Sequence, residues 1–170
     1  MNQAQPSTMP APARTERDLD ARLVGVVLDS AQPLPGGPQD SWLVAIDGSE
    51  HSLRAAAQAA QLAGQTRHGA IHLVHVQPWI SKEAAENELA QRGWEATADA
   101  RALLERSGIA WRLHVRMGDP AERIAALGSE LGCRAIAIGS QGVGATVGLL
   151  LGSVAYKLLH LSQTPVLLVR

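Results

Sequence analysis

Short apolar runs alternate with segments of helical periodicity from Ser41 to the end of the chain, and this alternation limits the folds open to the sequence. Five runs have the length of buried strands, at residues 42–46, 70–76, 110–116, 135–138 and 165–169. The segments between them place apolar residues three or four positions apart, as amphipathic helices do. Strands that alternate with helices form βαβ units with parallel strands. The sequence therefore predicts an α/β fold, a doubly wound five-stranded parallel sheet with helices on both faces.

The run at residues 110–116 differs from the other four because it alternates apolar and polar side chains. Trp111, Leu113 and Val115 are separated by Arg112 and His114. One apolar face and one solvated face are typical of a strand at the edge of a sheet. We therefore expect this third strand to form an edge.

The first 40 residues differ from the rest because they contain six of the nine prolines. We interpret residues 1–40 as a partly disordered N-terminal extension with a Pro/Gly linker at 33–38, and residues 41–170 as the folded domain. Residues 1–14 are expected to be disordered. The apolar run at residues 23–28 fits either a strand or a helix. The extension is either a loose cover over apolar surface or a specific interaction segment.

Composition argues against nucleic acid as a partner. The net charge is −1, and the chain contains no Phe, one Tyr and four Trp. A surface that binds nucleic acid needs excess positive charge, and one that binds single strands also needs aromatic side chains for stacking. We therefore expect no nucleic-acid partner.

Cysteine content and hydropathy indicate a cytoplasmic protein without a membrane partner. The single cysteine, Cys133, excludes an intramolecular disulfide and fits a reducing compartment. Residues 135–156 contain no charge over 22 positions, which is long enough for a membrane span, but five glycines interrupt them. The start of the chain does not have the charged and apolar regions of a secretory signal.

A glycine-rich stretch, residues 139–153, lies between the fourth predicted strand and the last predicted helix. Glycine allows a ligand to approach main-chain N–H groups without a Cβ in the way. A strand, a glycine-rich loop and a helix N-terminus together favour phosphate binding. Open α/β sheets bind ligands at the carboxyl ends of their strands, where Asp47 and Gly139 both lie. Two alternatives do not need a ligand: Asp47 could cap the first helix, and Ser153 could be the N-cap of the last one.

The spacing of Gly139, Gly142, Gly152 and Ser153 resembles the nucleotide-binding signature of the universal stress protein family. Other segments are similar to that family in order and spacing, and they lie at residues 44–49, 73–76, 118–120 and 164–169. The resemblance covers about residues 41–170.

The resemblance implies a strand order of 3-2-1-4-5 and a homodimer that pairs through the C-terminal strand, residues 165–170. It also implies that the protein binds ATP, or ADP or AMP, and acts as a regulatory module in stress responses. Two other functions stay open. The protein could be a slow ATPase or self-phosphorylating enzyme, with Ser153 as the modified residue, or a nucleotide-independent interaction protein. We identify no catalytic residue.

The resemblance also implies the role of each candidate binding residue. Asp47 is expected near the ribose and phosphates, where it could hold Mg²⁺ together with phosphate oxygens. The adenine would lie between Ala45, Ile46 and Val76. The ribose and phosphates would lie beside Gly139, Ser140, Gly142 and Val143. The phosphates would receive N–H groups from Gly152, Ser153 and Val154.

The chain departs from the family pattern in its charge. Gln141 stands where the family often has Arg or His, and residues 143–151 contain no basic side chain. A hydrogen bond to a charged group contributes about 1.5–3 kcal/mol. We therefore expect a weaker hold on the triphosphate of ATP than on AMP or ADP, unless Lys157 compensates.

Overall fold

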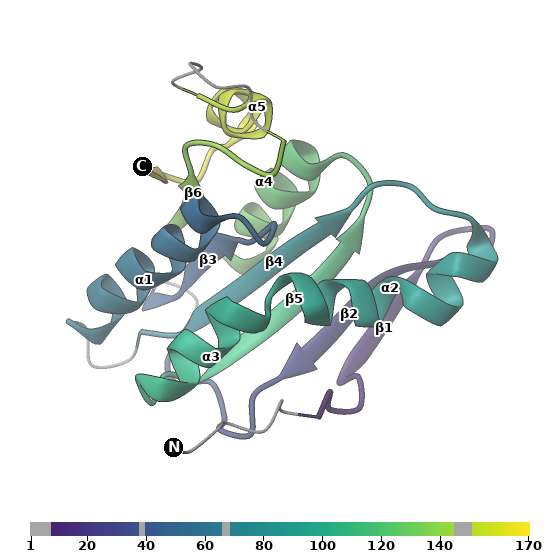
Figure 1. Cartoon of the computed structure of the whole chain (residues 1–170), viewed down its shortest axis with the longest axis horizontal. Coiled ribbons are helices and arrows are strands. Elements are labelled where there is room, and N and C mark those ends of the chain that lie inside the picture. Colours follow the sequence, from purple (N-terminus) through teal and green to yellow (C-terminus); the bar gives the residue numbers. More distant parts are fainter. Residues whose placement is uncertain (1–7, 38–39, 66–68, 145–150) are drawn as a thin grey trace.

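A computed structural model describes residues 8–37, 40–65, 69–144 and 151–170 (Figure 1). One sheet of seven strands forms its centre, in the order β1-β2-β5-β4-β3-β6-β7. The strands are β1 (Arg14–Arg17), β2 (Leu23–Asp29), β3 (Trp42–Ala45), β4 (Ile71–Gln77), β5 (Trp111–Met117), β6 (Ala135–Gly139) and β7 (Val166–Val169).

The sheet corrects the prediction of five parallel strands in the order 3-2-1-4-5. The α/β class is confirmed, but the sheet is mixed and has two further strands. Strands β5, β4, β3, β6 and β7 pair in parallel, whereas β1 and β2 pair antiparallel and extend the sheet beyond β5. Both additional strands come from the N-terminal extension, where the apolar run at residues 23–28 forms a strand.

The expectation that residues 110–116 form an edge strand is also wrong, because β2 covers the edge of β5. The polar residues of β5 have partners on neighbouring strands, although Arg112 is still partly exposed. Arg112 Nε donates to Asp29 Oδ1 of β2 at 2.6 Å, and Arg116 forms an ion pair with Glu16 of β1. His114 and Arg116 are only 4% and 8% exposed. The polar face of β5 thus matches polar partners in the extension.

Five helices cover the two faces of the sheet, namely α1 (Glu50–Gly64), α2 (Lys82–Ala96), α3 (Ala98–Arg106), α4 (Pro120–Leu131) and α5 (Ser153–Leu161). Ser49, Ser81 and Asp119 begin α1, α2 and α4 as N-caps, each accepting a backbone N–H. In Figure 1, α1, α2 and α3 lie in front of the sheet and α4 lies behind it. Successive residues of a strand point to opposite faces, so Leu73 packs in the cluster under α1 to α3 while Val74 packs in the cluster under α4 and α5.

Within the described residues, no helix combines the length and the apolar character that a membrane crossing requires.

Two buried histidines lie side by side in the sheet, on β4 and β5. His72 Nδ1 is 3.0 Å from His114 Nε2. Burial, with the charge of Arg112, lowers the pKa of His72 to about 4. Burial lowers the pKa of His114 to about 3, with help from His72, Arg112 and Arg14. Both rings are therefore neutral in the folded protein at neutral pH.

The histidine pair predicts a stability that falls in mild acid. Unfolded histidine titrates near pH ~6.5, so below this pH the unfolded chain binds protons that folded His72 and His114 do not. The free energy of unfolding should be greatest above pH ~6.5 and should fall as the pH drops towards ~4. Urea unfolding of the wild type and of His72→Leu/His114→Leu across this range tests the prediction. The free energy of unfolding of the double variant should depend less on pH, because the other titrating groups are common to both proteins. An equal pH dependence in the two proteins would contradict the prediction.

Candidate functional site

A cavity of about 490 Å³ lies at the carboxyl ends of β3, β4 and β6. Its volume suits a small organic ligand. The eleven residues predicted from the sequence all line it: Ala45, Ile46, Asp47, Val76, Gly139, Ser140, Gly142, Val143, Gly152, Ser153 and Val154. They come from four segments of the chain, and the parallel sheet brings these segments together.

Asp47 organises the turn from β3 into α1. Its Oδ1 accepts hydrogen bonds from Ser49 N at 3.0 Å and from Ser49 Oγ at 2.6 Å. Gly48 follows with φ +86°, a backbone conformation that glycine adopts without strain. The N-cap of α1 is Ser49, whose Oγ accepts from Ser52 N. The alternative that Asp47 itself caps the helix is therefore wrong.

A hydrogen bond from Val143 N to Asp47 Oδ2, 2.8 Å long, joins this turn to the glycine-rich loop. The loop passes so closely that a Cβ on Gly142 would lie 2.4 Å from Asp47 Oδ2. A Cβ on Gly139 would lie 2.7 Å from the Cβ of His51 in α1. The contact between the two segments thus explains two of the signature glycines without a ligand.

The Asp47 carboxyl is ionised at neutral pH. Partial burial acts to raise its pKa, but hydrogen bonds from Ser49 and Val143 outweigh this and hold the pKa below its usual value. A carboxylate has about four lone-pair sites, so its oxygens have room for a further contact. A cation or a ribose hydroxyl fits that position, whereas a bare phosphate would be repelled.

Gly152 differs from the other two signature glycines because its own surroundings do not require glycine. Its φ of −73° is open to any residue. The nearest atoms to a Cβ at this position would be Gln141 Cα and Ser140 O, both at 3.4 Å. Among the described residues a Cβ at this position would thus meet only ordinary contacts, and Gly152 itself lines the cavity.

The N-terminus of α5 faces this space, and here two details of the sequence prediction change. Gly152 is the N-cap and Ser153 the first helical residue, so Ser153 is not the N-cap. Gly152 N donates to Ser140 O at 2.7 Å, so this N–H is already used. The first N–H groups of a helix have no intrahelical acceptor, and within the described residues no side-chain hydrogen bond caps α5. Ser153 and Val154 therefore remain as N–H donors towards a ligand.

Ser140 is almost fully enclosed, at 2% exposure. Its N donates to Val169 O in β7 at 2.6 Å, and its Oγ lies 3.4 Å from His51 Nδ1. Val143, by contrast, is 74% exposed. Ser140 thus fixes the start of the loop, while Val143 lies at the rim of the cavity.

Sequence reasoning missed nine residues that also line the cavity: Ser52, Val74, Pro78, Pro120, Ile124, Ile138, Gln141, Gly144 and Ala155. Val74 could have been found, since it shares a strand face with Val76. Pro120 and Ile124 could not, because they depend on how α4 packs behind the sheet. These residues make the wall near β4 largely apolar.

The described lining contains no Lys, Arg or His and one acidic residue, Asp47. Lys157, considered above as a compensating cation, instead pairs with Asp119 Oδ2 at 3.1 Å and Glu122 Oε1 at 2.9 Å. Among the described residues there is no cluster of three or more His, Cys, Asp or Glu side chains suited to a metal ion. A metal at Asp47 would therefore need ligands from a bound molecule. Residues 145–150 of the glycine-rich stretch lie outside the described residues.

The contrast between Gly142 and Gly152 predicts different effects of alanine on stability. Gly142→Ala should displace the Asp47 carboxylate and break its bond to Val143, at a cost of about 1–2 kcal/mol. Gly152→Ala should cost less, about 0.5 kcal/mol, because alanine is a poorer N-cap than glycine but its Cβ meets no described atom closer than 3.4 Å. Urea unfolding of both variants measures the difference. Equal destabilisation would show that Gly152 is needed for folding.

Comparison with known proteins identifies relatives of this architecture. The sequence model of the Universal stress protein family matches residues 41–170. Universal stress protein YxiE of Bacillus subtilis is 29% identical over 147 residues, covering 77% of this chain and 99% of that protein. Universal stress protein MJ0531 of Methanocaldococcus jannaschii is 30% identical over 138 residues, covering 75% of this chain and 80% of that protein.

Solved structures share the fold at lower identity. The hypothetical protein MJ0577 superposes with a TM-score of 0.68 at 23% identity, covering 76% of this chain and 94% of its own. A universal stress protein in complex with cAMP superposes with a TM-score of 0.61 at 24% identity, and the match covers 79% of this chain and 99% of that chain. The universal stress protein from Archaeoglobus fulgidus in complex with dAMP superposes with a TM-score of 0.59 at 20% identity, and the match covers 78% of this chain and 98% of that chain.

Proposed function

The chain belongs to the universal stress protein family, and we propose that its cavity binds an adenine nucleotide, ATP or its products ADP and AMP. In this proposal the protein acts as a dimeric regulatory module in stress responses. The observation that carries the proposal is the uncapped N-terminus of α5, which opens on the cavity beside a glycine whose own surroundings do not require glycine.

The phosphate end of the ligand would lie at this helix terminus. The N–H groups of Ser153 and Val154 and the Ser153 hydroxyl offer donors there, and a helix N-terminus favours an anion by about 0.3–1 kcal/mol. A side chain on residue 152 would fill the approach. The signature glycine at this position is thus explained by a ligand that comes close to the backbone.

The base would lie at the other end, between Ala45, Ile46 and Val76. This part of the lining is apolar, as the flat face of a purine requires. Two relatives of the same fold are described as complexes with cAMP and dAMP, both adenine nucleotides. These complexes support adenine rather than another base.

Charge would decide which nucleotide binds best. No described lining residue is Lys or Arg, and Asp47 adds a negative charge beside the expected ribose and phosphates. A triphosphate therefore needs a counter-ion, and carboxylate with phosphate oxygens is a usual environment of Mg²⁺. We propose that Mg²⁺ enters with ATP and that AMP and ADP depend on it less.

Nucleotide binding is tested by isothermal titration calorimetry with AMP, ADP and ATP, each with Mg²⁺ and with EDTA. We expect all three nucleotides to bind. EDTA should weaken ATP binding about tenfold or more, as expected for the loss of one charged contact of about 1.5–3 kcal/mol. It should weaken AMP binding less. Gly152→Val should remove binding because its side chain fills the phosphate approach.

Gly37→Val is the matched control, since a Cβ there meets no atom of the described residues within 4 Å and Gly37 is not among the described residues that line the cavity. It should bind as the wild type does. Unchanged affinity in a folded Gly152→Val protein would refute the placement of the phosphates. Absence of binding by the wild type would refute the nucleotide proposal. Phosphate release, or a mass increase after incubation with ATP, would favour the enzymatic alternative.

We also propose that two copies pair through β7 and the residues around it, 165–170. Strand β7 ends the sheet order, so one side of it carries unpaired N–H and C=O groups. Exposed apolar side chains accompany this edge: Leu168 on β7, and Tyr156, Leu159 and Leu161 on α5. An apolar edge of this kind favours pairing with a second copy.

A cytoplasmic location fits the single buried thiol, Cys133.

The dimer is tested with Leu168→Lys, which places a charge on the proposed interface. Light scattering after size-exclusion chromatography should give a dimer for the wild type and a monomer for the variant, because edge lysines oppose strand pairing. Leu19→Lys is the control, since Leu19 is fully exposed in the turn between β1 and β2. A Leu168→Lys protein that remains dimeric would place the interface elsewhere.

A further inference from the structure

The turn between β1 and β2, residues 18–22, lies at the same edge of the sheet as the cavity. Strand β2 runs antiparallel to β5, with Asp29 opposite Arg112 and Gly25 opposite Arg116. The beginning of β2 therefore lies beside the carboxyl end of β5. The N-terminal hairpin, residues 14–29, thus carries its turn to the ligand-binding edge of the parallel strands.

The turn is held in one shape by its own hydrogen bonds. Asp18 Oδ1 accepts from Asp20 N at 3.0 Å and from Arg22 N at 2.9 Å. Asp18 N donates to Arg22 O, and Ala21 N donates to Asp18 O, both at 3.0 Å. Ala21 adopts φ +56°, a left-handed conformation that is costly for alanine. These bonds compensate that cost and make the turn a stiff element.

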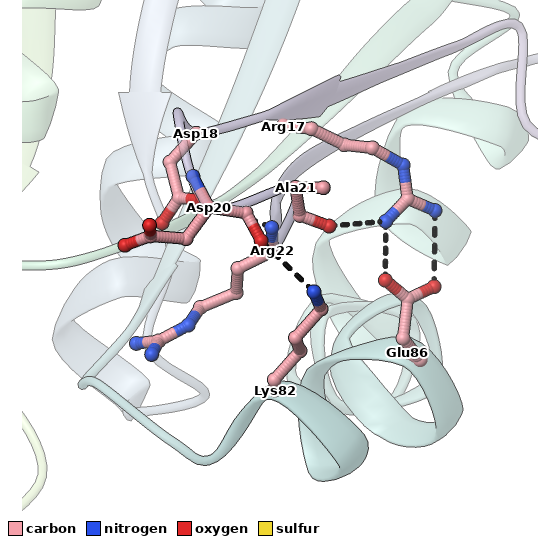
Figure 2. Close-up of polar contacts among 7 residues, drawn as sticks. All are labelled: Arg17, Asp18, Asp20, Ala21, Arg22, Lys82 and Glu86. Atoms are coloured by element: carbon pink, nitrogen blue, oxygen red, sulfur yellow. Dashed lines mark hydrogen bonds and ion pairs between the residues drawn. The ribbon is translucent and has the colours of Figure 1, made fainter.

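Figure 2 shows this turn fastened to the start of α2. Arg17 forms a two-pronged ion pair with Glu86, of which the Nη2–Oε2 bond measures 3.0 Å, and Arg17 Nη1 also donates to Ala21 O at 2.9 Å. Lys82 Nζ donates to Asp20 O at 2.8 Å. The first two turns of α2 are therefore tied to the hairpin at two points.

A third contact reaches the connection from β4 to α2, residues 78–81. The guanidinium of Arg22 lies 5.7 Å from the ring centroid of Trp79, within range of a cation–π interaction. Trp79 follows Pro78, which lines the cavity next to Val76. At the β4 end, Gln77 O accepts from Gly118 N at 2.9 Å. The connection is thus fixed at its β4 end by the bond to Gln77 O and at its α2 end by the contacts with the hairpin.

We propose that the N-terminal hairpin, through Arg17, Arg22 and the contact of Asp20 with Lys82, positions the β4–α2 connection and so determines nucleotide affinity at the base end of the cavity. None of these four residues lines the cavity, so they act as positioning residues. Pro78 and Trp79 are both exposed. Ile80 packs against the hydrophobic core, so the polar contacts of the hairpin add their constraint at the exposed part of the connection, at Pro78 and Trp79. The inference rests on the proposed nucleotide binding.

The experiment uses the full chain and two measurements, hydrogen–deuterium exchange of the amides of residues 77–82 without ligand, and AMP affinity by calorimetry. Arg17→Gln/Lys82→Gln removes two anchors. We expect about threefold faster exchange in residues 77–82 and about three- to tenfold weaker AMP binding, as for loss of exposed ion pairs and hydrogen bonds. Arg17→Glu alone should change both values in the same direction, and the charge swap Arg17→Glu/Glu86→Arg should bring them back towards the wild type in part, because it re-forms the ion pair but not the bond to Ala21 O.

Arg92→Gln is the matched control. It breaks an ion pair with Glu88 on the same helix, and the side chains are 45% and 49% exposed, against 45% and 38% for Arg17 and Glu86. This variant should change neither measurement. Unchanged exchange in Arg17→Gln/Lys82→Gln, or faster exchange with unchanged AMP affinity, would overturn the inference. If the wild type binds no AMP, the affinity claim fails with the proposed function, and the exchange data then show separately whether the hairpin holds the connection.

Discussion

The parallel pairing of β3 with both β4 and β6 is the constraint on which the site depends. It places the ends of three strands at one edge, so that the turn at Asp47, the connection after Gln77 and the loop after Gly139 all begin within reach of one another. The hydrogen bond from Val143 N to Asp47 Oδ2 then joins two of these segments directly. A cavity forms because α4 and α5 stand behind this edge without filling it. The lining residues at the strand ends therefore owe their position to strand pairing, and those on α4 and α5 to the packing of these helices against the sheet.

The charges at this edge are unusual for the phosphate site that we propose, because the one charged side chain of the described lining is a carboxylate. The hydrogen bonds that hold the Asp47 carboxylate in place also keep it ionised, so the feature that shapes the cavity gives it a negative wall. The described lining offers no cationic side chain in return, and Lys157 is occupied by Asp119 and Glu122. Backbone N–H groups and a helix dipole are modest compensation. A metal ion that travels with the nucleotide is thus a physical requirement of the proposal for ATP, and less so for AMP.

Sequence patterns predicted what depends on local order along the chain. They indicated the strands and helices after Ser41 and placed Asp47 and the glycine-rich stretch at strand ends, because periodicity and glycine spacing are local signals. The other candidate residues came from the family resemblance. They failed where distant segments meet. The polar alternation of β5 predicted a solvated edge, since the sequence cannot show that Asp29 and Glu16 pair with Arg112 and Arg116. The use of the Gly152 N–H by Ser140 O, and the packing of Ile124 into the cavity wall, likewise depend on tertiary contacts.

The extension changes which edges of the sheet are open to partners. Without residues 14–29, β5 would be an edge strand, and its Arg112 and Arg116 would lose their partners Asp29 and Glu16. With them, the new edge is β1, whose sequence Arg-Thr-Glu-Arg is charged and mostly exposed. Charged edge strands resist pairing with another chain, whereas the opposite edge, β7, is uncharged and carries exposed leucine. The hairpin therefore leaves one edge suited to self-association and one that is not. The turn of the same hairpin contacts Trp79, the neighbour of Pro78, which lines the cavity. In this chain, protection of the sheet edge and shaping of the binding site thus come from a single added element.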